Sequence, residues 1–446
     1  MKIVIAGAGS VGFHLAELLT KENQDIILID TDEDVLLHAS THLDVLTIKG
    51  DIASVGILKN ANVENASLFI AVTTSETTNL LSAILAKQLG AKTTIARVDN
   101  PEYLTKEQKG KFLNLGVDQL ISPQLLAAQE IERLLRRSSF TDVFEFEDGK
   151  IAIVGFTIDN SSSIIGKSMD QMDKLIPDFD FRGIAILRNH RTLIPKGNTI
   201  IRQGDHLYIA AQKHCVDKVS IFAGKQLKPV KKLMIIGDTP LAFRTAQLLE
   251  KKYRISLFVK DKKRAKFFIE SLNKTLVSVA DYGNIELLQE EGLQEMDAFI
   301  ALTKNSETNI ITNLMAEELG VYKTIAAVDN TIYTHISQNI GIDTMINKKL
   351  IAANNIFRFV RKGTIKAIAS LHGVDAELIE FEILRSNRLT SHPIRDLHLP
   401  EKSIIAGVVR GEESFIPNGE FQLQLKDKII VFAQPEAIHK VEEIFK

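Results

Sequence analysis

The chain of 446 residues has little of what usually marks a secreted, membrane or nucleic-acid-binding protein. Its one cysteine, Cys215, excludes an intramolecular disulfide, fits a reducing compartment and is interpreted as a small buried residue. No apolar run approaches the roughly 18 residues that a membrane helix needs. The formal net charge of −2 offers no overall field for nucleic acid or anionic lipid. We therefore expect a cytoplasmic chain that does not span a membrane and binds no nucleic acid.

Metal-binding and catalytic patterns are scarce as well. The eleven histidines are interpreted as scattered, with neither H-x-x-x-H spacing nor cysteine pairing, so no metal site is predicted. An NAD-dependent oxidoreductase needs a proton relay beside the nicotinamide, and no His/Asp or Lys/Tyr pair is visible in the β-rich segments. A DNA-binding regulator needs a basic recognition helix, and these segments have strand patterns. The sequence thus argues against an enzyme and predicts no catalytic residues.

The most informative stretch is the first twelve residues, MKIVIAGAGSVG. A buried apolar strand delivers Gly7, Gly9 and Gly12 at G-x-G-x-x-G spacing onto the start of a helix. Gly7 permits the tight turn, Gly9 lets a pyrophosphate approach the backbone, and Gly12 lets helix and strand pack closely. The spacing predicts a dinucleotide cradle at the helix N-terminus.

A second strand ends at Asp30, about 20 residues downstream, where a carboxylate would bind a ribose hydroxyl. Four other residues lie at predicted strand ends. Asp51 is a ligand candidate or a helix cap. Thr73 and Thr74 either approach the ribose or phosphates or cap the next helix. Arg97 serves the ligand or an interface, with a surface ion pair as the alternative.

Strands and helices alternate through residues 1–137, which predicts a doubly wound parallel sheet. Residues 143–224 have short alternating strands with Gly, Asp and Pro turns, which favours a small α+β module. The pattern then recurs: residues 51–103 and 281–333 are identical at 18 of 53 positions without gaps. The predicted fold is two Rossmann-like domains, each followed by an α+β module, at residues 1–137, 143–224, 230–363 and 372–446.

The second repeat departs from the motif. At a constant offset of 230, Thr239 replaces Gly9, Ala242 replaces Gly12, Lys260 replaces Asp30 and Ala327 replaces Arg97, while Pro240 removes an amide. One interpretation is a decayed site; the other is a changed ligand, with Lys260 favouring a phosphate. The basic cluster that runs from Lys260 to Lys266 is either a solvated helix start or a contact for phosphate or for an acidic protein face.

Five segments together resemble the nucleotide-binding half of RCK (regulator of potassium conductance) domains: GAGSVGFHLAELL, LIDTD, KGDIAS, AVTTSETTNLLSAILAKQLG and IARVDNPEY. Residues 143–224 and 372–446 resemble the C-terminal half of these domains. The duplicated order over nearly the whole chain is similar to the peripheral subunits of bacterial Trk potassium uptake systems.

The resemblance implies a regulator at the inner face of the membrane that binds NAD(H), with ATP or ADP as further candidates. It implies a ring of RCK domains, a tetramer of chains, docked beneath a membrane potassium-translocating subunit. The implied first pocket consists of Gly7, Ala8, Gly9, Ser10, Val11, Asp30, Thr73, Thr74 and Arg97. In the second repeat, Gly237 and Asp261 are the surviving candidates. The alternatives are an NAD-dependent oxidoreductase and a regulator of a different potassium channel or antiporter.

Overall fold

The computed structural model divides into two compact units, Met1–Gln129 with Asn347–Arg361, and Glu130–Ile346 with Lys362–Lys446. It describes residues 1–20, 24–160, 162–175, 181–189, 191–222, 228–329, 344–357, 365–370, 374, 376–385 and 388–445. The domain ends expected at residues 224, 363 and 372 lie outside this set. No helix within these ranges is long and apolar enough to cross a membrane.

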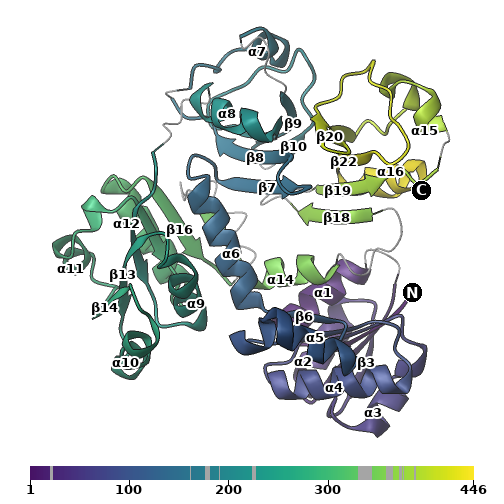
Figure 1. Cartoon of the computed structure of the whole chain (residues 1–446), viewed down its shortest axis with the longest axis vertical. Coiled ribbons are helices and arrows are strands. Elements are labelled where there is room, and N and C mark those ends of the chain that lie inside the picture. The colour runs from purple at the N-terminus through teal and green to yellow at the C-terminus, as the bar shows by residue number, and fades with distance from the viewer. Residues whose placement is uncertain are drawn as a thin grey trace. The chain divides into compact units, whose positions relative to one another are not determined.

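The first unit contains a six-stranded parallel sheet in the order β3-β2-β1-β4-β5-β6, with helices on either side (Figure 1). Its strands are β1 (Lys2–Ala6), β2 (Asp25–Asp30), β3 (Leu46–Lys49), β4 (Leu68–Ala71), β5 (Thr94–Arg97) and β6 (Gln119–Ile121). Its helices are α1 (Ser10–Thr20), α2 (Glu33–His42), α3 (Val55–Asn60), α4 (Glu76–Leu89) and α5 (Lys106–Asn114), with 3₁₀ turns η1 (Val63–Asn65) and η2 (Pro101–Leu104). The predicted doubly wound sheet is confirmed.

Local sequence explains most of these elements. The central strands β1 and β4 are apolar and buried almost throughout, as strands covered by helices on both faces must be. Asp32 and Ser75 cap α2 and α4 with their side-chain oxygens. Helix α5 was not predicted, because none of its residues is buried and it therefore lacks an apolar stripe.

The second unit repeats the sheet in the order β14-β13-β12-β15-β16-β17. Its strands are β12 (Lys232–Ile236), β13 (Arg254–Val259), β14 (Leu276–Val279), β15 (Ala298–Ala301), β16 (Lys323–Ala327) and β17 (Thr344–Ile346). Its helices are α9 (Pro240–Leu249), α10 (Lys262–Ser271), α11 (Ile285–Glu290) and α12 (Ser306–Glu318), with the 3₁₀ turn η4 (Leu293–Glu295). The identical strand order confirms the duplicated Rossmann-like fold.

Two antiparallel five-stranded sheets also belong to this unit, in the orders β10-β9-β11-β8-β7 and β18-β19-β22-β20-β21. The first comprises β7 (Asp142–Phe146), β8 (Ile151–Thr157), β9 (Phe181–Arg188), β10 (Arg191–Leu193) and β11 (His206–Gln212), with α7 (Met169–Leu175), η3 (Lys213–Cys215) and α8 (Val216–Phe222). The second comprises β18 (Ile365–Ser370), β19 (Glu377–Glu382), β20 (Ser403–Arg410), β21 (Glu413–Phe415) and β22 (Lys428–Ala433), with α15 (Arg388–Ser391), η5 (Ile394–Leu397) and α16 (Pro435–Phe445). Both match the predicted α+β modules.

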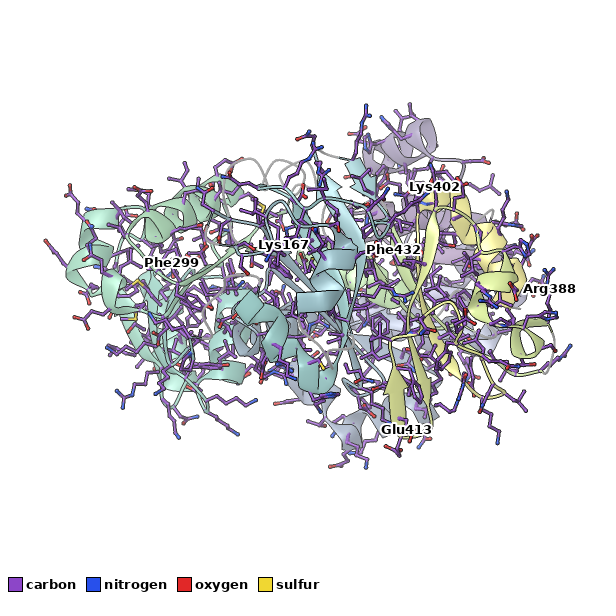
Figure 2. All side chains as sticks on the ribbon, turned by 90° about the horizontal axis from the view of Figure 1, so that it is seen from above. Lys167, Phe299, Arg388, Lys402, Glu413 and Phe432 are labelled. Carbon is purple, nitrogen blue, oxygen red and sulfur yellow. The ribbon has the colours of Figure 1, made fainter. Side chains whose placement is uncertain are left out.

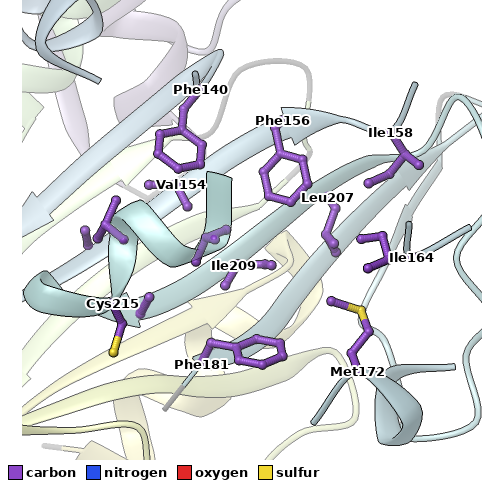
Figure 3. Packing of buried hydrophobic residues seen from close by; sticks show 14 of the residues in the cluster. Phe140, Val154, Phe156, Ile158, Ile164, Met172, Phe181, Leu207, Ile209 and Cys215 are labelled. Atoms are coloured by element: carbon purple, nitrogen blue, oxygen red, sulfur yellow. The ribbon is translucent and has the colours of Figure 1, made fainter. Parts of the chain in front are cut away.

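The first module has a core of its own, and the two modules share another. In the first module, Phe140, Phe156 and Leu207 pack in a cluster that also buries Cys215, as expected (Figure 3). The opposite face of the same sheet joins a cluster with residues of the second module, including Leu378 and Phe432. Figure 2 shows the contrast between buried and surface positions. Phe432 on β22 and Phe299 on β15 are buried, whereas Arg388, Lys402 and Glu413 are exposed.

One helix packs away from its neighbours in sequence. Helix α14 (Lys348–Phe357) follows the second parallel sheet in the chain, but it belongs to the first unit and packs against α1 there. Its buried face consists of Ala352, Ala353, Ile356 and Phe357. A separate helix, α6 (Pro123–Arg136), follows the first sheet, and from Glu130 on it belongs to the second unit, where Glu132 pairs with Lys252.

Candidate nucleotide-binding site

The glycine turn of the first repeat has the geometry of an open cradle. Gly7 has φ +105°, and a Cβ there would lie 2.8 Å from the backbone nitrogen of Thr73. A Cβ on Gly12 would lie 1.8 Å from the Gly7 carbonyl oxygen, so α1 sits as close to the turn as only glycine allows. A Cβ on Gly9, by contrast, would meet nothing within 4 Å. The space above Gly9 is therefore free for a ligand.

The N-terminus of α1 faces this space. Phe13 donates its amide to the Gly9 carbonyl oxygen at 2.8 Å, which is the first turn of the helix. The amides of Ser10, Val11 and Gly12 precede it and have no acceptor within the helix. Ser10 and Gly9 are exposed, whereas Ala8 and Val11 are buried. Free amides and the positive end of the helix dipole together favour an anion such as a pyrophosphate.

Asp30 is held beside the turn. Its Oδ2 accepts the Ala8 amide at 2.7 Å, and its Oδ1 accepts the Asp32 amide at 3.1 Å. These two bonds fix the carboxylate at the end of β2, and each oxygen keeps a lone pair for another donor. The predicted pairing of glycine turn and acid is thus built in the structure, and a ribose hydroxyl is a chemically suitable donor.

Thr73 is held by hydrogen bonds within the fold. The Thr73 hydroxyl donates to Asn79 Oδ1 at 2.7 Å, and Asn79 Nδ2 donates to the carbonyl oxygens of Thr73 and Arg97. Asn79 is fully buried and was not singled out from the sequence. Asn309 makes the same bonds to Thr303 and Ala327 in the second repeat. Because both repeats keep it, this asparagine clamp serves the fold.

The contacts of three side chains bear on alternatives that the sequence left open. Ser75 caps α4, so neither Thr73 nor the exposed Thr74 is its N-cap. Asp51 is exposed, and its Oδ1 accepts the Ala53 amide at 2.9 Å in a turn before the helix. Arg97 is 19% exposed and pairs with Asp99 at 3.2 Å. Thr74, Asp51 and Arg97 lie at the carboxyl edge of the sheet, but among the candidates that the structure describes only the glycine turn and Asp30 are joined by a hydrogen bond.

The corresponding turn of the second repeat is closed. Gly237 keeps a positive φ of +134°, and a Cβ there would lie 2.4 Å from the Leu302 carbonyl oxygen. Thr239 replaces the open glycine: its hydroxyl donates to that carbonyl oxygen at 2.7 Å and accepts the Ala242 amide at 3.1 Å. Pro240 occupies the first helical position and has no amide hydrogen. The threonine thus takes up a donor that an anion would use in the first repeat.

The structure corrects one equivalence between the repeats. The constant offset pairs Asp30 with Lys260, but the residue at the end of β13 in the same sheet register is Val259. Four residues separate buried Leu249 from Arg254, one fewer than at the same link of the first repeat. Ungapped comparison could not detect this deletion, because it lies upstream of the compared stretch and is compensated before β14.

Lys260 and Asp261 have other contacts. Lys260 Nζ pairs with Asp281 Oδ2 at 3.1 Å on the surface, and this hydrogen bond lowers the pKa of the Asp281 carboxyl. Asp261 caps α10 by accepting the Arg264 amide at 2.7 Å. In the first repeat Asp30 accepts the amide of a turn residue, Ala8. The bonds described here for Lys260 and Asp261 include no such contact with the glycine turn.

Two predictions about histidines, that no His/Asp pair is present in the β-rich segments and that no H-x-x-x-H spacing occurs, are wrong. The first module does contain a His/Asp pair, with His206 Nε2 3.2 Å from Asp142 Oδ2 and the Tyr208 hydroxyl donating to the same oxygen at 3.1 Å. All three residues are buried, and burial raises the pKa of Tyr208, so the cluster is packed inside the module and is not presented to a substrate. His38 and His42 lie four residues apart on α2, at the H-x-x-x-H spacing that was expected to be absent, with ring centroids 4.3 Å apart. Among the described residues, no group of three or more His, Cys, Asp or Glu could hold a metal ion.

Two Rossmann-like sheets, one with an open and one with a closed glycine turn, each paired with an antiparallel module, define the class of duplicated RCK-type proteins. The chain belongs to the TrkA family: the TrkA-N domain matches residues 3–123 and 233–348, and the TrkA-C domain matches residues 153–224 and 378–446.

Relatives extend over the whole chain. The Trk system potassium uptake protein TrkA homolog of Archaeoglobus fulgidus is 34% identical over 447 residues, covering 100% of both chains. The Trk system potassium uptake protein TrkA of Haemophilus influenzae is 31% identical, covering 100% of this chain and 99% of its own. These names describe potassium uptake proteins rather than catalysts, and the expectation that the chain is not an enzyme is confirmed.

Solved structures agree on the fold. The GsuK RCK domain has a TM-score of 0.62 at 16% identity and covers 100% of this chain and 94% of its own. The GsuK channel bound to NAD has the same TM-score and identity, covering 100% of this chain and 78% of its own. The similarity confirms the RCK architecture that the sequence predicted.

Proposed function

We propose that the chain is a nucleotide-binding regulatory subunit of a potassium uptake system. It assembles with copies of itself at the inner face of the membrane and controls a membrane potassium-translocating subunit. Full-length similarity to Trk system proteins supports the transport role. The observation that carries nucleotide binding is the 2.7 Å bond between the Ala8 amide and Asp30, which joins the open turn to the ribose-binding acid.

The first repeat holds the proposed ligand, NAD(H), with ATP and ADP as competitors. The residues present fit such a group, because Gly9 leaves the space above the turn empty and the α1 amides point into it. The amides of Ser10 and Val11 bind the pyrophosphate, and Asp30 binds the adenosine ribose. Arg97 and Thr74 lie at the same sheet edge and complete the pocket.

Control follows from differential binding. A nucleotide that binds one arrangement of the subunits more tightly shifts the population toward it, and no turnover is needed. A coupling of about 1–3 kcal/mol changes the balance roughly 5- to 150-fold. The closed turn of the second repeat supports a single nucleotide of this kind per chain, and Gly237 and Asp261 serve there as a turn residue and a helix cap.

Calorimetric titration of the full chain with NAD+, NADH, ATP and ADP tests this proposal. Gly9→Asp places a carboxylate in the empty space without a steric clash, since a Cβ there meets no atom within 4 Å. We expect one site per chain, lost in this variant. Thr239→Asp is the matched control in the second repeat; aspartate also caps helices, so binding should not change.

A flux measurement tests the regulatory role. Potassium flux through the membrane subunit expressed with the chain should respond to the nucleotide, and Gly9→Asp should abolish that response while the two proteins still co-purify. Absence of nucleotide binding in the unmodified chain, or sustained NADH turnover, contradicts the proposal. Nucleotide binding without any effect on the Trk-type subunit favours a different channel or antiporter as the partner.

A further inference from the structure

Helix α2 of the first unit carries two histidines on one face. His38 and His42 are four residues apart, so their side chains lie one turn above the other. Their ring centroids are 4.3 Å apart, and both residues are exposed. In this they differ from His206, which is buried beside Asp142. Two imidazoles at this spacing on a helix can chelate one transition-metal ion.

A hydrogen bond to the backbone prepares the ring of His42 for a metal. Its Nδ1 lies 2.8 Å from the carbonyl oxygen of His38. Because a carbonyl oxygen can only accept, Nδ1 carries the hydrogen of this bond. In the neutral ring the lone pair therefore belongs to Nε2. Metal-binding histidines usually donate their other ring nitrogen to an oxygen in this manner.

The ring of His38 is positioned by an aromatic contact. It stacks on Phe13 of α1, with centroids 5.0 Å apart and ring planes inclined by 30°. Neither of its ring nitrogens forms a hydrogen bond with another residue that the structure describes. The stack thus orients the ring without using its nitrogens, and a lone pair is left for a metal ion.

Burial aligns α2 with α10 of the second repeat. Each helix buries two residues that are three apart, Leu36 with Ala39 in α2 and Ala265 with Phe268 in α10. The two helices therefore correspond one residue earlier than the constant offset, as the deletion before β13 requires. Phe267 stands in the place of His38, and Ser271 stands in the place of His42.

The aromatic stack is common to both repeats, whereas the imidazoles are not. Phe243 on α9 stands in the place of Phe13, and its ring centroid is 5.2 Å from that of Phe267. The fold thus requires a flat ring at the position of His38 but no ring nitrogen. Only the first repeat has nitrogen atoms on this face, and packing does not account for them.

The electrostatic surroundings of the pair favour a cation. His42 is the last residue of α2, where the carbonyl groups of the final turn form the negative end of the helix. Asp34 precedes His38 by one turn, and Asp44 follows His42 by two residues. Both acids are exposed. A bound divalent ion would therefore lie in a region of negative potential.

We propose that His38 and His42 bind one divalent cation of the late first transition series, Zn²⁺ being the ion to test first. Imidazole nitrogen suits Zn²⁺, Ni²⁺ and Cu²⁺, whereas Mg²⁺ and Ca²⁺ prefer oxygen. No group of three or more metal-binding side chains is present among the described residues, so water completes the coordination. The pair lies in the second half of α2, away from the Asp32 cap that adjoins Asp30, and is independent of the proposed nucleotide pocket.

Calorimetric titration of the full chain with Zn²⁺, after removal of metal by a chelator, tests this proposal. We expect one site per chain and no binding of Mg²⁺ to it. H38F/H42S installs the residues of the second repeat and should raise the Kd for Zn²⁺ at least about tenfold. Phenylalanine keeps the stack on Phe13 and both positions are exposed, so the variant should fold.

A matched control removes two exposed histidines elsewhere in the chain. H392Q/H439Q leaves α2 unchanged and should alter the Kd for Zn²⁺ less than about threefold. Electron paramagnetic resonance of the Cu²⁺-loaded chain identifies the ligands directly. Splitting from two nitrogen nuclei should be present in the unmodified chain and in the control, and absent in H38F/H42S.

The outcomes separate this proposal from the nucleotide site. NAD(H) affinity should be the same in H38F/H42S as in the unmodified chain, since the two sites share no residue. Absence of a Zn²⁺ site, or equal losses in the two double variants, overturns the proposal. Equal affinity for Mg²⁺ overturns it as well, because it would indicate carboxylate ligands in place of the imidazoles.

Discussion

The two parallel sheets have the same strand order and the same asparagine clamp, yet only the first has an open glycine turn. Three differences fall at the turn and the adjoining strand end: Thr239 in place of Gly9, Ala242 in place of Gly12 and Val259 in place of Asp30. The duplicated fold thus separates residues that build the sheet from residues that serve a ligand. What both repeats retain is structural, and what only one retains is a candidate for binding.

The first turn glycine should matter equally in both repeats. Gly7→Ala and Gly237→Ala each place a Cβ against backbone atoms, at 2.8 Å and 2.4 Å, in a left-handed conformation. We expect each to lower the free energy of unfolding by about 2–5 kcal/mol. Denaturant unfolding of the two variants checks this. A large loss only for Gly7→Ala would mean that this glycine is kept for the ligand.

Asp30→Asn should weaken NAD(H) binding roughly 10- to 100-fold, because it removes a charged acceptor from the pocket. Calorimetric titration measures the change. The control is Asp261→Asn in the second repeat, where asparagine still caps α10. NAD(H) affinity should be unchanged in the control; a comparable loss there would show that the second repeat contributes to the same site.

Glu250 stands where the first repeat has Thr20, and its carboxylate makes hydrogen bonds that the described contacts of Thr20 do not reproduce. It is buried, and its Oε2 accepts the amides of Asn273 and Lys274 and the hydroxyl of Thr275. Burial alone would raise the pKa of Glu250, but these bonds hold it below its ordinary value of 4.5.

A lowered pKa in the folded state makes the carboxylate stabilising above the unfolded pKa, and this contribution disappears as the pH falls through the folded pKa. Glu250→Gln should therefore lower the free energy of unfolding by about 1–2 kcal/mol at pH 7 and by progressively less below pH 4.5. Chemical unfolding at several pH values tests this, and a loss that is constant with pH would contradict it.

The smallest expected effects concern Gly9 and Thr239, which occupy the same position in the two glycine turns. Thr239→Ala removes the α9 cap and should destabilise the second unit by about 1 kcal/mol without affecting NAD(H) binding. Gly9→Ala, its partner in the first repeat, should leave stability unchanged, since its Cβ meets open space, but should weaken binding. Thermal unfolding and calorimetry on the pair separate the two roles, and the reverse pattern would show that the open turn is structural.

The sequence alone determined the two parallel sheets, the antiparallel modules, the duplication and the joined glycine turn and acid. These follow from local patterns: buried apolar strands, glycine spacing, and an acid at a strand end. Such patterns depend on residues close in the chain or at a regular spacing, so they can be recognised without coordinates.

Tertiary structure decided the rest. Helix α14 packs on α1 of the first unit, the His206–Asp142 pair is buried, and Val259 rather than Lys260 stands at the end of β13. Phe13 of α1 also positions the ring of His38 from another helix. Each depends on side chains far apart in sequence or on a deletion that only sheet register reveals. Packing free energy, which depends on the whole fold, settles these positions, and no local pattern encodes it.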